Sequence, residues 1–181
     1  MANPFENSDA ALSFFQECLR NRGIVISEVK TIKVSISQGK FVYQKQIWTQ
    51  NNEIYHVKYW TKRWLPKDSS KVSDFAKPLD EKLKMSIKLF GNGDNSASGL
   101  NENTLLDLLE LSKKGYQTYL ITIYQTGEIL WCRAEELYYF SSRFGLIPQF
   151  SSTYGEPFCW IPTGWLKNFE EVVINYPGTI K

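Results

Sequence analysis

The feature that most constrains the fold is a row of three strand-like segments between residues 24 and 60. Residues 24–36 (IVISEVKTIKVSI) are rich in β-branched side chains, and apolar and polar positions alternate along them. Residues 40–48 (KFVYQKQIW) and 53–60 (EIYHVKYW) follow, with the turn sequence TQNN between them. Alternation of this kind is typical of strands, and a short turn between two strands indicates an antiparallel hairpin. We therefore predict three strands of one sheet, of which the last two form a hairpin.

Helical periodicity surrounds these strands. Apolar side chains recur at helical spacing after Ser8-Asp9 and stop at Gly23, and leucines recur in the same way from residue 105 until Gly115. Two more strands are predicted at 116–124 and 128–132, then a helix at 133–145. A last strand and helix are predicted within 155–169, where Leu166 and Phe169 form a Leu-x-x-Phe step. This order predicts an α/β (or α+β) fold in which helices flank a mixed central sheet.

A chain of 181 residues is expected to form a single domain, residues 1–181. Residues 65–103 are rich in proline, serine and lysine, so we predict an irregular insertion or loop with one short helix or strand near 83–90. Residues 146–181 are interpreted as a C-terminal extension packed on the core. Its Trp160 and Trp165 would cover an edge of the sheet or make a homodimer contact, and the simpler interpretation is that they pack in the core.

The total charge of +2 conceals an uneven distribution. From Lys30 to Lys88 there are thirteen Lys/Arg and five Asp/Glu, a local charge of +8, whereas the rest of the chain has eight against fourteen. A basic middle between acidic flanks is typical of a surface that binds a polyanion. The alternative is a set of solvated lysines on strands and loops.

Features of other compartments are not found in the sequence. The first 23 residues do not combine a basic region with an apolar one as a secretory signal does, and no run of about 18 apolar residues predicts a spanning helix. The three cysteines, Cys18, Cys132 and Cys159, are an odd number without CxxC spacing. We therefore expect a reduced, cytoplasmic protein that does not contact membranes.

Residues 55–67 (YHVKYWTKRWLPK) interleave cations with aromatic rings and contain the only histidine. Cations of such a segment bind phosphates, and its rings stack on bases. The predicted nucleic-acid-binding residues are Lys58, Trp60, Lys62, Arg63, Trp64 and Lys67. The alternative is that the tryptophans belong to the core and the cations merely surround them.

Residues 105–137 (LLDLLELSKKGYQTYLITIYQTGEILWCRAEEL) and the order helix, three strands, helix, two strands resemble the PD-(D/E)XK superfamily, the restriction-endonuclease-like nucleases that include Holliday-junction resolvases. The resemblance covers residues 8–62 and 102–140. It implies a site in which carboxylates hold Mg²⁺ and a lysine two residues after an acidic residue reaches the phosphate.

Two places have the spacing that this resemblance implies, and neither completes the motif. Glu28-Val29-Lys30 has it on the first strand, where the pair shares a face with isoleucines unless a bulge turns the strand over. His56-Val57-Lys58 has it on the third strand, with histidine in the acidic position. The acidic residue that the family places on the preceding strand would fall near Gln44 or Gln46.

The catalytic candidates are therefore Glu28, Lys30, His56 and Lys58, and Glu17 and Glu28 would bind Mg²⁺ if the protein is active. His56 is either a phosphate contact or general base, or a buried histidine satisfied by its neighbours.

Together these patterns predict a nucleic-acid-binding protein with a nuclease-like core, and we expect DNA as its partner. Cleavage is left open, and with it any requirement for a cofactor. One alternative is an active Mg²⁺-dependent DNA endonuclease or junction resolvase. The other is a protein-interaction module that does not bind nucleic acid and uses its aromatic C-terminal segment.

Overall fold

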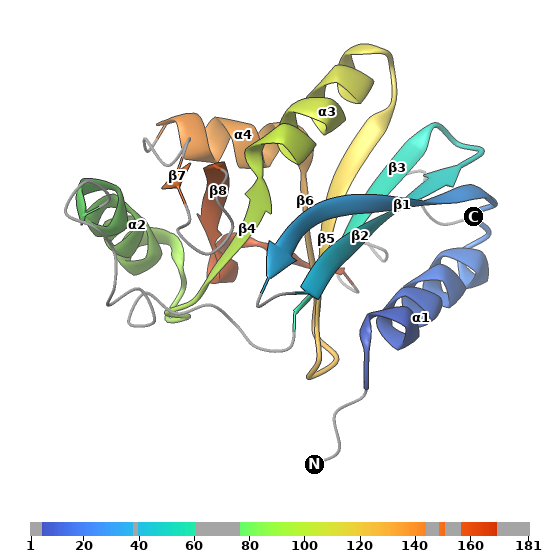
Figure 1. Cartoon of the computed structure of the whole chain (residues 1–181), viewed down its shortest axis with the longest axis horizontal. Coiled ribbons are helices and arrows are strands. Elements are labelled where there is room, and N and C mark those ends of the chain that lie inside the picture. The colour runs from blue at the N-terminus through green and yellow to red at the C-terminus, as the bar shows by residue number, and fades with distance from the viewer. Residues whose placement is uncertain (1–4, 38–39, 61–76, 144–148, 151–156, 170–181) are drawn as a thin grey trace.

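The computed structural model describes residues 5–37, 40–60, 77–143, 149–150 and 157–169 (Figure 1). Side-chain environments are described for residues 5–32, 44–60, 84–98, 100–139 and 161–169. No helix among these described residues is both long and apolar enough to cross a membrane.

A six-stranded mixed sheet forms the centre of the fold, in the order β1-β2-β3-β5-β6-β9. Its strands are β1 (Ile26–Ser37), β2 (Lys40–Thr49), β3 (Glu53–Trp60), β5 (Gln117–Tyr124), β6 (Ile129–Arg133) and β9 (Lys167–Asn168). Neighbouring strands are antiparallel except β3 and β5, which are parallel. The prediction of three strands with a hairpin between the last two is thus confirmed, as is the mixed sheet.

Each face of this sheet has its own core. Helix α1 (Ser8–Asn21) packs Phe15 and Leu19 against odd-numbered β3 residues such as Tyr55 on the surface that we call the α1 face. On the opposite surface, the α3 face, even-numbered residues such as Ile54 join a core that includes Leu105 of α3. Helices α3 (Glu102–Lys113) and α4 (Ala134–Arg143) cover this side. Successive strand residues point to opposite faces of the sheet, so the side chains of one strand contribute alternately to the two cores.

Residues 65–103 contain more regular structure than the sequence predicted. The short element expected near 83–90 is a 14-residue helix, α2 (Lys77–Phe90), and it is followed by β4 (Ala97–Asn101). Strand β4 belongs to a second sheet with β7 (Gln149–Phe150) and β8 (Pro157–Pro162), in the order β4-β8-β7. The polar composition of this stretch concealed an amphipathic helix that buries Ser86 and Ile87 while Met85 and Leu89 are exposed.

The helix predicted to contain both Leu166 and Phe169 is wrong for residues 163–168, whereas Phe169 is helical and the residues after it lie outside the described part of the chain. A 3₁₀ turn at Thr163–Trp165 leads into an extended Leu166, with φ −65° and ψ 150°, and then into β9. Leu166 enters the core of the α3 face and Phe169 that of the α1 face. Side chains three apart on an extended chain point to opposite sides, so the Leu-x-x-Phe step spans the sheet edge instead of lining one side of a helix.

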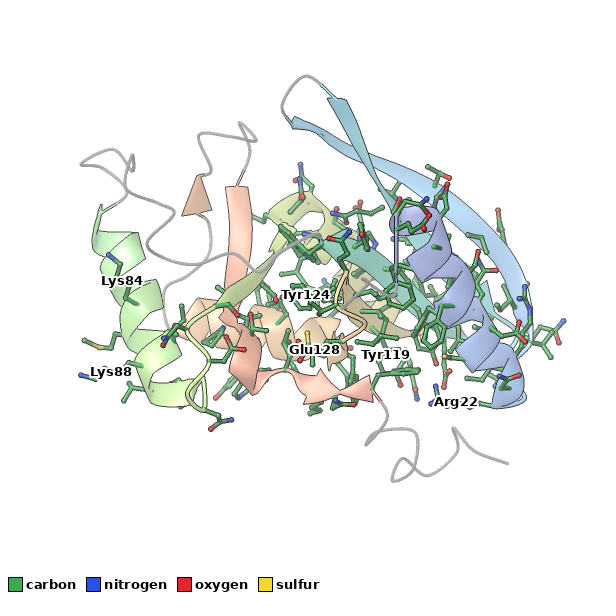
Figure 2. All side chains as sticks on the ribbon, turned by 90° about the horizontal axis from the view of Figure 1, so that it is seen from below. Arg22, Lys84, Lys88, Tyr119, Tyr124 and Glu128 are labelled. Atoms are coloured by element: carbon green, nitrogen blue, oxygen red, sulfur yellow. The ribbon has the colours of Figure 1, made fainter. Side chains whose placement is uncertain are left out.

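Strands β1 and β2 extend as a two-stranded ribbon beyond the rest of the sheet. They pair from Ile26↔Thr49 out to Ser37↔Lys40, whereas β2 pairs with β3 only between Lys45 and Trp48. Figure 2 shows the two strands rising away from the body of the molecule. The far part of the ribbon therefore has β1 and β2 as its only paired strands among the described residues.

Candidate functional site

His56 lies in the middle of β3 on the α3 face and is completely buried. It is placed beside β2 by the pairing Gln46↔His56, and both of its ring nitrogens meet glutamines of that strand. Nδ1 is 3.3 Å from the Gln46 amide nitrogen, and Nε2 is hydrogen-bonded to the Gln44 side-chain oxygen. An amide nitrogen can only donate and an amide oxygen can only accept, so these partners assign the ring proton to Nε2.

Burial also fixes the charge of this ring. Loss of solvent, followed by the positive charge of Lys58, lowers the pKa of His56 from 6.5 to about 3. The imidazole is therefore neutral at physiological pH, with both nitrogens engaged. Of the two interpretations of His56, this geometry corresponds to the buried histidine satisfied by its neighbours.

Lys58 and Trp60 share the α3 face with His56, as their spacing predicts. Only 4% of Lys58 is exposed, and its ammonium lies 4.7 Å from the centre of the Trp60 ring. Trp60 is half-buried and packs against the core of that face. Both side chains thus belong to the interior side of the sheet, which differs from the open binding surface expected for them.

The other predicted contacts of this segment, Lys62, Arg63, Trp64 and Lys67, lie outside the described residues. The basic part of the chain nevertheless does not form one surface. Lys84 and Lys88 are on α2, at the end of the molecule opposite α1 and away from the ribbon (Figure 2).

Glu28 and Lys30 are at the start of the ribbon. A register shift between Ile26 and Glu28 is the bulge that the sequence allowed, and it frees the charged pair from the face of the preceding isoleucines. The Glu28 carboxylate lies 3.9 Å from the Lys30 ammonium, which also lies 3.8 Å from the centre of the Trp48 ring. Both side chains are solvent-accessible, so this is a surface ion pair worth at most about 1 kcal/mol.

The carboxylates considered for Mg²⁺ are held apart. Glu17 pairs with Arg20 at 3.6 Å, and Glu28 pairs with Lys30. Glu53 is buried and accepts a hydrogen bond of 2.5 Å from the Tyr55 hydroxyl, on the α1 face as its parity predicts.

The fit of Mg²⁺ to the described residues is therefore poor. The groups around His56 are two amides, an imidazole and an ammonium, whereas Mg²⁺ is held by carboxylate oxygens. Within the described part of the chain, no three His, Cys, Asp or Glu side chains are arranged to hold a metal ion.

A cleft that the sequence reasoning missed lies on the α1 face, where the ribbon separates from β3. It has a volume of about 300 Å³. Its lining includes Asp9 and Leu12 of α1, Thr31 and Lys45 of the ribbon, and Val57 and Tyr59 of β3. Thr31, Lys45 and Val57 are paired across three neighbouring strands, so their side chains form one row on one face of the sheet. The predicted strands could have indicated this row. The position of α1 over it was not predictable from residue spacing.

Lys45 and Tyr59 give this cleft its polarity. The Lys45 ammonium donates to the Thr31 hydroxyl at 2.5 Å, and the Tyr59 hydroxyl donates to the Phe5 carbonyl at 3.2 Å. Among the described residues no ion pair involves Lys45, in contrast to Lys30 on the neighbouring strand. Lys45 is therefore the charged group of this cleft that is left to attract an anion.

Comparison with known proteins identifies no relative: no family model, no curated protein and no solved structure matches this chain. The class that the geometry defines is a mixed α/β protein: its described residues form a six-stranded mixed sheet with four helices packed against it.

Proposed function

We propose that this protein binds nucleic acid through the β1–β2 ribbon. The observation that carries the proposal is the charge of the ribbon. It contains Lys30, Lys33, Lys40 and Lys45, and no Asp or Glu occurs between Glu28 and Glu53. Glu28, at the base of β1, is the one acidic residue in the sequence of the two strands, so beyond it the ribbon carries only positive charge and attracts a polyanion.

The shape of the ribbon supports the same function. A two-stranded antiparallel ribbon is, with the α-helix, one of the two elements that fit the major groove of B-DNA, which is about 12 Å wide. The ribbon extends beyond β3, so its far end is free of other described strands. Double-stranded DNA is therefore the partner that fits this element.

The basic segment that follows β3 begins at the same end of the sheet. Because β3 runs antiparallel to β2, its last residue, Trp60, lies toward the end from which the ribbon projects. Lys62, Arg63 and Lys67 follow directly in the sequence. These cations would add phosphate contacts to those of the ribbon.

We also infer that the core of the fold is restriction-endonuclease-like, as the sequence resemblance implies. Its support is topological: α1, the antiparallel strands β1 to β3, α3, and then β5 parallel to β3, with α1 and α3 on opposite faces. In this interpretation α2 and β4 are inserted between β3 and α3. Because the described carboxylates do not gather at one place, the proposal is binding, and cleavage is a separate question for experiment.

Binding is tested by fluorescence anisotropy of a labelled DNA duplex as a function of salt. The logarithm of the association constant should fall with the logarithm of the salt concentration by about 0.9 for each phosphate neutralised. Lys33→Gln combined with Lys40→Gln should reduce that slope by about two, whereas Lys84→Gln combined with Lys88→Gln is the matched control on α2. Wild-type protein that does not bind at low salt would overturn the proposal and favour the protein-interaction alternative.

The same samples test cleavage in Mg²⁺ and Mn²⁺ with duplex and branched DNA. Metal-dependent cleavage that Glu28→Gln abolishes would establish the endonuclease alternative. Binding without cleavage would leave the proposed function as stated.

A further inference from the structure

The cleft on the α1 face exists because two strands separate there. β2 and β3 pair as far as Lys45↔Val57. Beyond this pair β2 belongs to the ribbon, and β3 continues to Trp60. The first turn of α1 lies over this point and contributes Asp9 and Leu12. The cleft is therefore built by three elements and opens at the base of the ribbon, next to the surface proposed for nucleic acid.

Its groups complement more than a bare anion. The Lys45 ammonium and the Thr31 hydroxyl, 2.5 Å apart, are positioned to contact one phosphate group. The Asp9 carboxylate lines the same cleft and would repel a second negative charge, but it accepts a hydrogen bond from a hydroxyl or amino group. Leu12 and Val57 supply apolar surface between these polar groups. A matching ligand carries an anion, a hydrogen-bond donor and an apolar body within a short distance.

We propose that this cleft binds one unpaired nucleotide of the nucleic acid that the ribbon holds. The phosphate contacts Lys45 and Thr31, an amino or hydroxyl group of the nucleotide donates to Asp9, and the base or sugar covers Leu12 and Val57. The volume of about 300 Å³ is at the lower end of small-ligand sites, so it suits one nucleotide and not a duplex. The inference rests on the proposed function and specifies the ligand further, as a duplex with an unpaired nucleotide at its end.

The ribbon offers a matched control. Lys30 and Lys45 are near neighbours, since Lys30 pairs with Gln46 and Lys45 with Thr31, but only Lys45 lines the cleft. Lys30 is paired with Glu28 and lies over the Trp48 ring. Replacing either lysine by glutamine removes one charge from the ribbon, so a difference between the two variants reports the cleft and not the net charge.

The experiment compares the affinity of the protein for a blunt DNA duplex with that for the same duplex carrying a short single-stranded overhang. Wild-type protein should prefer the overhang by about tenfold, the effect of one charge-assisted contact. Lys45→Gln and Asp9→Asn should abolish the preference. Lys45→Gln should weaken blunt-duplex binding only as much as Lys30→Gln does, and Lys30→Gln should retain the preference. Nucleoside monophosphate should shift the NMR resonances of Thr31 and Tyr59, and inorganic phosphate at equal concentration should shift them less.

The outcomes separate this inference from the proposed function. Equal affinity for blunt and overhang duplexes, or equal loss of preference in Lys30→Gln and Lys45→Gln, overturns the cleft inference and leaves nucleic-acid binding intact. Absence of binding to either duplex by the wild-type protein overturns the proposed function itself. Equal shifts with inorganic phosphate and nucleotide would show that the cleft recognises a phosphate alone, which also overturns the inference.

Discussion

His56 provides a quantitative link between burial and stability. The folded protein holds the pKa of this ring at about 3, mainly through burial, while an exposed histidine has a pKa of 6.5. Between these values the unfolded chain binds a proton that the folded chain does not bind. The contribution of His56 to the free energy of unfolding should therefore be constant above pH 6.5 and should decrease as the pH is lowered from 6.5 toward 3.

The size of this loss follows from the two pKa values. The full difference of about 3.5 pH units corresponds to about 5 kcal/mol, which is an upper limit reached only near pH 3. Between pH 7.5 and pH 4.5 the contribution of His56 should fall by about 3 kcal/mol. That is a large part of the stability of an ordinary domain, which is about 5–15 kcal/mol.

The matched variant is His56→Gln, whose amide does not titrate but still offers a donor and an acceptor to Gln44 and Gln46. Urea unfolding followed by tryptophan fluorescence gives the free energy of unfolding of both proteins at pH 7.5 and pH 4.5. Other titrating groups cancel in the difference between the two proteins. We expect the advantage of the wild type to shrink by about 3 kcal/mol at the lower pH. A difference that does not change with pH would refute the claim that burial holds this ring neutral.

Three further predictions concern the cores and the packing between elements. Phe15→Ala removes a fully buried ring and should lower the free energy of unfolding by about 3–5 kcal/mol, whereas Phe14→Ala, at a half-exposed position, should cost less than about 1 kcal/mol in the same urea assay. Gly164→Ala would put a methyl group 1.7 Å from the Gly91 carbonyl oxygen and should destabilise by about 1–3 kcal/mol; an unchanged urea midpoint would contradict that close approach. Cys132 is fully buried, and burial followed by the Glu136 carboxylate raises the pKa of its thiol, so it should react with a thiol reagent only after unfolding, as quantitative labelling with and without urea would show.

The strands of the main sheet were predictable because their sequences alternate and their turns are short. The alternation of residues 24–60 identified β1, β2 and β3, and the shared face of His56 and Lys58 followed from the same period. The fate of Leu166 and Phe169 was not predictable, because a spacing of three satisfies one side of a helix and equally an extended chain that crosses a sheet edge. Local pattern alone could not decide between them.

The site was less predictable than the sheet. The sequence placed His56 and Lys58 together and allowed a buried His56, but it did not predict a buried Lys58, since what covers a face of a sheet is decided by elements distant in the chain. The cleft around Lys45 was missed for the same reason: it needs the first turn of α1, the ribbon and β3 at once. Residue spacing describes one element at a time, whereas a cleft is a property of several.

The parallel pairing of β3 with β5 joins two strands that have 56 residues between them in the sequence, residues 61–116. Such a contact cannot form until a long loop has closed. The chain loses the entropy of that closure before the strand pairing stabilises it. The β2–β3 and β5–β6 hairpins on either side can form quickly from neighbouring residues, but the sheet is not complete until β3 pairs with β5. We expect the β3–β5 pairing to set the folding rate of the whole molecule. Destabilising substitutions in β3 or β5 should therefore slow folding, while substitutions in the ribbon should leave the rate unaltered.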